Sequence, residues 1–214
     1  MTRRQRYVQL QASISIHIHD IFVFNVAHDA TANACANANS HQGSLTKLIS
    51  LNLGFGEPLK GTTMHEIMHS GSIVSLTAEH PRNPRALVSG LYNPDGIDIS
   101  KSNQRMYWSN MGNPSKPDGS IQSANLDGTD VQYVVPTGKI HTGKQLHIDQ
   151  EHDKIYFCDR EGLRVMRCNL DGSELEELFK TGDWEKEPEK VKDQRNWPVG
   201  ITVSQKLKKV CCIS

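Results

Sequence analysis

The sequence lacks any long hydrophobic run, and no stretch of its 214 residues approaches the roughly 18 apolar residues that a transmembrane helix needs. We therefore expect no membrane-spanning segment. An excess of either charge is also missing, because 24 Lys and Arg residues balance 24 Asp and Glu residues. Without a basic surplus, the composition does not favour binding to nucleic acid or to an anionic membrane surface.

Features of secreted proteins are missing as well. The sequence has no Asn-x-Ser/Thr site with x other than Pro, and its five cysteines are odd in number and show no Cys-x-x-Cys spacing. The first twenty residues begin with a basic cluster, but polar residues interrupt the apolar segment that a signal peptide requires. These absences indicate an intracellular, cytoplasmic chain with free thiols.

Glycine and proline are present in numbers that favour short strands over long helices, with 16 Gly and 9 Pro residues. Residues 13–26 keep an apolar period of two and predict one strand or a pair of strands. The Ala/Asn-rich residues 30–40 are typical of a linker. We therefore expect residues 1–70 to form a poorly structured N-terminal region or a degenerate unit of the repeat that follows.

Residues 71–214 contain an internal repeat. Ile97, Leu146 and Ile201 occupy equivalent positions, at spacings of 49 and 55 residues. Two further columns recur in the same order. One is an aromatic segment that contains Tyr107 in one unit and Tyr156 in the next, and the other is an Asn-Leu-Asp-Gly turn that recurs after 44 residues. Recurrence of three columns in register predicts a repeat protein.

Each unit of this repeat has the pattern of four short strands joined by polar turns within about 45 to 50 residues. Four strands in that length are typical of one blade of a β-propeller, and the Asp-Gly turns suit tight antiparallel hairpins. A single blade cannot bury both of its faces, so neighbouring blades must stack. The sequence therefore predicts an all-β fold, a partial β-propeller with four-stranded antiparallel blades over residues 71–214.

The motifs of this repeat resemble the YWTD, or LDL-receptor class B, repeat of six-bladed, TolB-like propellers. Residues 107–110 and 156–159 each match the tetrapeptide of that name at about half of its positions. The resemblance covers roughly residues 71–214 and is specific, because the columns recur in register. The residues that carry it are Tyr107, Trp108, Asn110, Tyr156, Phe157 and Asp159 in the aromatic strands, and Asp127, Gly128, Asp171 and Gly172 in the turns.

The resemblance implies structural roles for these residues. In propellers of the family, the Asp at the position of Asp159 ties adjacent blades by hydrogen bonds, whereas Asn110 departs from the motif but keeps polar atoms that can form such bonds. The sequence shows about two full blades and the beginning of a third, and family propellers close with six. We therefore expect a fragment, a truncated propeller, or a half-propeller that needs a partner to close it.

A second motif precedes the repeat. His65-Glu66-x-x-His69 is the pattern that, on a helix, holds zinc between two imidazoles with the Glu as general base. A zinc peptidase also needs a third ligand, and Ser75 stands where the metzincin pattern has a histidine; Glu79 and His80 follow a predicted strand. The repeat alignment places residues 62–69 at the aromatic strand of a blade. We therefore expect a structural role there, with a zinc peptidase as the minority alternative.

Four polar residues are expected beside the central channel, because they lie on or next to the first strands of successive units: Asp95, Asp98, His141 and His147. The mouth of such a channel is a common ligand site. Related propellers of the gluconolactonase type hold a divalent cation there with carboxylate and amide oxygens. A solvated or hydrogen-bonded role and a role in holding Ca²⁺ or another ligand both fit these residues.

The charged segment 182–197 is an insertion between strands, and it accounts for the longer spacing of the last unit. Such a segment is usually a solvated loop. If it binds a partner, Trp184 and Trp197 are its predicted anchors, because aromatic side chains dominate interface hot spots.

The leading hypothesis from these patterns is a non-enzymatic binding or scaffolding module without a cofactor. Its ligand would be a protein or a small molecule at the propeller mouth. A divalent-cation-dependent propeller hydrolase or lactonase, using Asp95, Asp98 and His147, is the alternative, and the zinc peptidase is the second alternative.

Overall fold

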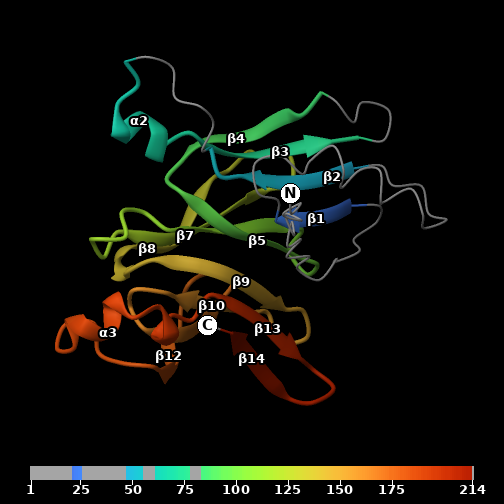
Figure 1. The fold of residues 1–214 in the computed structure, drawn as a ribbon. Coiled ribbons are helices and arrows are strands. Elements are labelled where there is room, and N and C mark those ends of the chain that lie inside the picture. Colours follow the sequence, from blue (N-terminus) through green and yellow to red (C-terminus); the bar gives the residue numbers. More distant parts are fainter. Residues whose placement is uncertain (1–20, 26–46, 55–60, 78–82, 214) are drawn as a thin grey trace, which may run out of the picture.

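The computed structural model describes residues 21–25, 47–54, 61–77 and 83–213, and these residues fold mainly into strands (Figure 1). Three four-stranded sheets follow one another along the chain, and a two-stranded hairpin follows the third. We name the sheets blades I, II and III. Blade I consists of β1 (Ile21–Asn25), β2 (Lys47–Asn52), β3 (Gly71–Leu76) and β4 (Arg85–Leu91).

Blades II and III confirm the predicted all-β, propeller-type repeat, since both are antiparallel sheets whose strands pair in sequence order. Blade II consists of β5 (Pro94–Ser100), β6 (Arg105–Asn110), β7 (Gly119–Asn125) and β8 (Gln132–Ile140). Blade III consists of β9 (Gly143–Asp149), β10 (Lys154–Asp159), β11 (Arg164–Asn169) and β12 (Glu176–Lys180). The separate hairpin that follows it consists of β13 (Gly200–Ser204) and β14 (Lys209–Ile213).

The core lies in layers between successive blades. Successive side chains of a strand point to opposite faces, so Trp108 and Tyr107 of β6 fill different layers. Trp108 is fully buried with residues of blades I and II, including Ile49 and Ile73. Tyr107 is buried with residues of blades II and III, including Phe157. The aromatic strand therefore holds its blade to both neighbours, which explains the recurrence of the aromatic column.

The two Asn-Leu-Asp-Gly turns have the same hydrogen bonds and also join blades. Asp127 and Asp171 each accept, through Oδ1, hydrogen bonds from the backbone amide and the hydroxyl of the residue two positions later. The glycine that follows takes a positive φ, +91° at Gly128 and +83° at Gly172. A Cβ at Gly172 would lie 1.9 Å from the carbonyl oxygen of Val134 in the preceding blade, so this turn packs directly on β8.

In blade I, one expectation from the sequence is wrong. Residues 62–69 do not form the aromatic strand of a blade; they include the short helix α2 (Met64–Met68). The strand at that place in the sheet is β2, which pairs with β3 from Leu48↔Leu76 to Asn52↔Ser72. The helix forms because Thr63 and Glu66 make a capping box, in which each side chain accepts the backbone amide of the other residue.

The boundary expected at residue 71 does not separate two folded parts, since β2 lies in the N-terminal region and β3 begins the repeat region. β1 supplies the fourth strand of blade I, but it pairs with β2 in parallel, unlike the first strands of blades II and III. Of the predicted N-terminal segments, residues 13–20 and 30–40 lie outside the described residues.

The segment 182–197 is more ordered than the solvated loop expected from its charge. It contains the helix α3 (Pro188–Lys192) and the 3-10 helix η1 (Gln194–Asn196). The blades follow one another as an open arc in Figure 1, and the described strands do not close a ring. No helix within the described ranges has the length and apolar character needed to cross a membrane.

Candidate functional site

The first strands of blades II and III, β5 and β9, carry three of the four predicted channel residues, Asp95, Asp98 and His147. Asp98 on β5 is buried, and its carboxylate accepts backbone N–H bonds from Ile99 and, across the blade boundary, from Ile148, both at 2.8 Å. Burial raises the pKa of Asp98 to about 7, although both amides favour its ionised form. Asp98 therefore joins two blades.

His147 lies close to this contact, and Asp95 makes a separate contact between the same two strands. The Nδ1 atom of His147 is 3.9 Å from Asp98 Oδ2, and burial lowers the pKa of His147 below its ordinary value. Asp95 forms an ion pair of 2.5 Å with Lys144 of β9, and both side chains are mostly buried. The predicted carboxylates are thus each bonded across the boundary between blades II and III.

His141 and Trp184 meet at the connection between blades II and III. Their rings are in an edge-to-face arrangement with centroids 5.0 Å apart. His141 is buried, which lowers its pKa, and its Nδ1 lies 3.1 Å from the Thr142 hydroxyl. The structure therefore places a predicted channel residue beside a predicted anchor of segment 182–197, a proximity that the sequence did not indicate.

Trp197, the second predicted anchor, is held within the fold. Its Nε1 donates a hydrogen bond of 2.7 Å to the carbonyl of Val191, and the Arg160 guanidinium stacks 4.7 Å from the centroid of its ring. These contacts fix the 182–197 segment against blade III. The prediction that Trp184 and Trp197 bind a partner stays a prediction.

Asp159 and Asn110 occupy equivalent positions at the ends of β10 and β6, where they face Arg164 and Ser120 respectively. Asp159 is fully buried and accepts the amides of His141 and Thr142 and an N–H of Arg164. This arrangement agrees with the blade-joining role implied by the family. In blade II a neutral pair replaces the ion pair, since Asn110 donates to the Ser120 hydroxyl at 3.1 Å.

His65 and Glu66 of the His-Glu-x-x-His motif lie on α2, and His69 is the residue that caps its C-terminal end. The rings of His65 and His69 are stacked with centroids 4.1 Å apart, and His69 also stacks on Tyr92 at 4.2 Å. Glu66 is used in the capping box, and its hydrogen bonds to Thr63 lower its pKa. The zinc peptidase stays a prediction, as does a Ca²⁺ site, and no cluster of three or more candidate metal ligands occurs in the described part.

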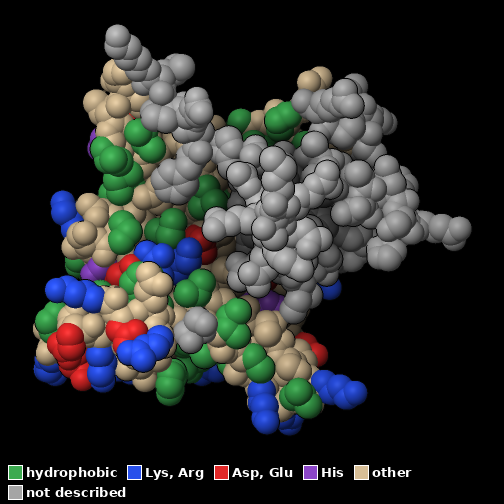
Figure 2. All heavy atoms as spheres, viewed as in Figure 1, with side chains coloured by type: hydrophobic (Ala, Val, Ile, Leu, Met, Phe, Trp, Pro, Cys, Tyr) green, Lys and Arg blue, Asp and Glu red, His purple; other side chains and the backbone are tan. Residues whose placement is uncertain are grey.

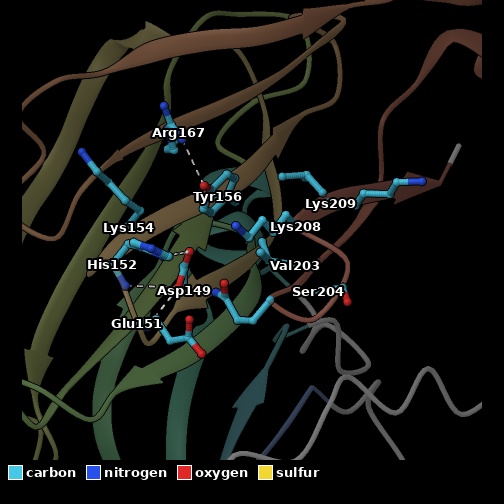
Figure 3. A pocket seen from close by; sticks show the side chains of 12 residues that line it. Asp149, Glu151, His152, Lys154, Tyr156, Arg167, Val203, Ser204, Lys208 and Lys209 are labelled. Atoms are coloured by element: carbon cyan, nitrogen blue, oxygen red, sulfur yellow. Dashed lines mark hydrogen bonds and ion pairs between the residues drawn. The ribbon is translucent and has the colours of Figure 1, made fainter.

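The structure adds a groove that the sequence analysis missed. A cavity of about 620 Å³ lies between blade III and the β13–β14 hairpin (Figure 3). Figure 3 shows the Tyr156 and Arg167 side chains joined by a hydrogen bond at one end, and His152 joined to Asp149 at the other. Its lining residues are Asp149, Glu151, His152, Lys154, Tyr156, Arg167, Val203, Ser204, Gln205, Lys208, Lys209 and Val210.

The groove combines apolar and charged groups. Arg167 is paired with Glu176, and Lys154 with Glu174. Lys208 and Lys209 are exposed and have no ion-pair partner among the described residues. They belong to the β13–β14 hairpin, which lies at the lower right of Figure 2 and presents Lys side chains to solvent. No repeat column marks the groove, because its lining residues come from separate strands and turns of blade III and of the β13–β14 hairpin.

Comparisons with known proteins agree with this fold. The chain is 42% identical over 126 residues to the 3-hydroxyacyl-CoA dehydrogenase-like protein LAM1 of Cochliobolus heterostrophus, a match covering 59% of this chain and 26% of that protein. It is 41% identical over 125 residues to the low-density lipoprotein receptor-related protein 1 of Pyricularia oryzae, covering 56% of this chain and 40% of that protein. The chain thus spans less than half the length of these two relatives. No family model matches it.

Among solved structures, a chain of a nidogen/laminin complex matches with a TM-score of 0.52 and 19% identity, covering 67% of this chain and 48% of that chain. The four-stranded antiparallel sheets and their stacking define a β-propeller module. The aromatic strands, the Asn-Leu-Asp-Gly turns and the receptor-related relative agree with the resemblance of this propeller to the LDL-receptor class B, or YWTD, type.

Proposed function

We propose that this propeller is a non-enzymatic binding module and that it holds a polypeptide in the groove between blade III and the β13–β14 hairpin. The proposal depends on a contrast between the polar groups of the channel and those of the groove. In the channel, the carboxylates of Asp95 and Asp98 already have partners across the blade boundary. The groove, in contrast, has two cations without partners beside apolar side chains such as Val203 and Val210.

The chemistry of the groove suits an extended polypeptide. A cavity of about 620 Å³ is within the range of ligand pockets. One wall is the β13–β14 hairpin, which offers the apolar side chains of Val203 and Val210 beside Lys208 and Lys209. The names of the receptor-related relative and of the nidogen/laminin complex are consistent with a binding role, although each name describes that protein only.

Dehydrogenase activity is not proposed, although the name of the Cochliobolus relative includes it. The match covers 26% of that protein. The 214 residues also contain no Gly-x-Gly-x-x-Gly segment, the fingerprint with which a dinucleotide-binding unit holds its pyrophosphate.

The test is selection of peptides from a displayed random library on the immobilised full chain, followed by affinity measurement. We expect the selected peptides to bind the double variant Lys208→Glu/Lys209→Glu about tenfold less tightly, because each reversal removes an attraction and adds a repulsion.

The matched control is Lys116→Glu. Lys116 is exposed, and its side chain has no partner among the described residues, so this charge reversal is expected to leave peptide binding unchanged. Selection of no peptide would contradict the proposal. Peptides equally sensitive to Lys116→Glu would do so as well, because they would report net charge and not the groove.

A further inference from the structure

The His-Glu-x-x-His motif at α2 is the sequence feature that the proposed function leaves unused. Its two histidines, His65 and His69, are four residues apart, a spacing that makes them neighbours on a helix. Their rings are stacked with centroids 4.1 Å apart and an interplanar angle of 21°. Two nitrogens on one tetrahedral zinc ion lie about 3.4 Å apart, since each Zn–N bond is about 2.1 Å long. The helix thus holds the two rings close to the separation at which they can share a metal ion.

The hydrogen bond of His69 leaves one ring nitrogen ready to bind a metal. Its Nδ1 lies 2.9 Å from the backbone carbonyl oxygen of His65. A carbonyl oxygen only accepts hydrogen bonds, so the proton of a neutral His69 ring is on Nδ1 and the lone pair is on Nε2. Metal-binding histidines have the same arrangement, in which a carbonyl or carboxylate accepts from one nitrogen and orients the ring. His69 is therefore oriented as an Nε2 ligand.

The surroundings of the pair fix its position. The capping box with Thr63 holds the first turn of α2. The Met68 carbonyl accepts the amide of Asn93 at 2.9 Å, which ties the last turn of the helix to the start of blade II. The His69 ring also stacks on Tyr92, with centroids 4.2 Å apart. A pair of ligands that is already ordered loses little conformational entropy when it binds, and this favours affinity.

Glu66 adds a negative charge, but its carboxylate is used within the helix. Its Oε2 accepts hydrogen bonds from the amide and the hydroxyl of Thr63, at 2.7 and 2.8 Å. These bonds lower the pKa of Glu66 and keep it ionised, so its charge near His65 favours a bound cation. No third candidate ligand completes a cluster with the pair in the described ranges. A catalytic zinc site has three protein ligands, so the pair indicates a different kind of site.

We propose that His65 and His69 form a two-histidine site for a divalent transition-metal ion, whose remaining positions are open to water or to a donor from another molecule. Imidazole nitrogens suit Zn²⁺, Ni²⁺ and Cu²⁺, and Cu²⁺ binds most tightly in the usual order of affinities. Ca²⁺ prefers oxygen ligands. The site does not depend on the polypeptide-binding groove, since α2 lies at the blade I end of the arc in Figure 1 and the β13–β14 hairpin at the other end.

The test is calorimetric titration of the full chain with Zn²⁺ and with Cu²⁺, each in a buffer that does not bind the metal. Because the chain has ten histidines, the site is identified by the difference between variants. We expect His65→Gln and His69→Gln each to weaken one equivalent of bound metal about tenfold or more, because the second nitrogen of a chelate acts at an effective concentration of about millimolar or above. Ca²⁺ is expected to give no heat that depends on either histidine.

The variants include one that keeps the helix cap. His69 caps α2, so His69→Gln alters the helix end as well, whereas His65→Gln removes only a side chain that faces the pair. The nitrogen couplings in the electron paramagnetic resonance spectrum of bound Cu²⁺ give a readout of imidazole binding that is independent of affinity. We expect the spectrum of the chain to lose the coupling of one imidazole in His65→Gln.

Three matched controls accompany these variants. His152→Gln changes an exposed histidine that is paired with Asp149, and it is expected to leave the affinity unchanged. Tyr92→Phe keeps a stacked ring without the hydroxyl and is expected to have no effect. Glu66→Gln keeps an oxygen for the capping box and is expected to weaken binding less than about threefold, because an exposed charge acts weakly through solvent.

Three outcomes would overturn the proposal. Equal metal binding by the chain and by both glutamine variants of the pair would place the metal on other histidines. Equal weakening by His152→Gln would show that exposed histidines in general take up the metal. A loss in Tyr92→Phe or Glu66→Gln as large as that in His65→Gln would identify a third protein ligand, and at Glu66 it would remove the capping role argued for that residue.

Discussion

At the scale of single residues, Asp159 shows how one carboxylate holds a blade boundary. It is fully buried and bonds to two backbone amides and Arg164. We predict that Asp159→Asn lowers the free energy of unfolding by about 3 kcal/mol, because the neutral amide cannot accept from all three donors and the Arg164 Nε loses its carboxylate partner. Urea denaturation measures this loss.

The control for that substitution is Asp171→Asn. Asp171 lies in an exposed turn, where its Oδ1 accepts from Ser173, and an asparagine oxygen can accept the same bond. The change is expected to cost less than about 1 kcal/mol. Equal losses at the two positions would show that Asp159 has no special role at the blade boundary.

Asp98 gives a prediction of pH dependence. Burial raises its pKa in the folded chain to about 7, whereas an Asp in an unfolded chain has a pKa of about 3.9. The folded state therefore holds more protons between these values, and its stability from this group falls as the pH rises from about 4 to about 7, by at most about 1.4 kcal/mol per pH unit. Below and above this window the contribution is constant.

The measurement is the urea midpoint at pH 5 and pH 7 for the chain and for Asp98→Asn. We expect the advantage of the chain over the variant to shrink as the pH rises. His147, whose pKa is lowered by burial, contributes a slope of opposite sign in both proteins, so the prediction concerns the difference between the two proteins. An advantage that stays constant or grows with pH would contradict the burial of Asp98 as the cause.

At the scale of elements, the Asn-Leu-Asp-Gly turn couples local conformation to blade packing. Gly172 has φ +83°, and a Cβ there would lie 1.9 Å from the Val134 carbonyl oxygen. Gly138 has φ +85° with no atom within 4 Å of such a Cβ. We predict that Gly138→Ala costs about 1 kcal/mol of stability from backbone strain alone. Gly172→Ala is expected to cost about 3 kcal/mol or more, since the blades must also separate.

Denaturation curves of the two variants check this prediction. Because both glycines have similar φ values, any difference between the two alanine variants reports the close approach of the turn to β8. Equal costs would mean that Gly172 is required for its conformation only and that the close approach of the turn to β8 adds nothing to its cost.

The elements of blades II and III were predictable from the sequence, because their strands recur with the same aromatic and turn residues. β2 and α2 were not. β2 lacks the tyrosine column, and its burial pattern depends on pairing with β3 across an 18-residue connection. The helix depends on a capping box between Thr63 and Glu66. The repeat alignment placed these residues on a strand instead, because it assumed that the connection between the second and third strands of blade I has ordinary length.

At the scale of the whole molecule, the candidate site could be predicted only in part. The spacing placed Asp95, Asp98 and His147 on adjacent first strands, and the structure brings His147 beside Asp98 while Asp95 pairs with Lys144. Their partners Lys144 and Ile148 come from the next blade, and no sequence pattern states which backbone amide a carboxylate accepts. The groove was missed because it lies between blade III and the β13–β14 hairpin, so that it is a property of the assembled sheets and not of any one segment.

The arrangement of blades also predicts a gradient of local stability. In stacked repeats, each unit is stabilised mainly by its neighbours. β6 and β10 are buried between two strands of their own sheets and between blades. β14 pairs on one side only, and its side chains are exposed. We therefore expect β14 amides to exchange hydrogen faster than β6 amides by on the order of a hundredfold in the full chain without peptide.

Hydrogen exchange with mass spectrometry resolves these strands. The control comparison is β10 against β6, which are expected to exchange at similar slow rates because both lie in complete blades. Protection of β14 equal to that of β6 would mean that the edge is already covered in solution. If protection of β14 also increased with protein concentration, the covering element would be another molecule of the chain, and the open groove would exist only in dilute solution.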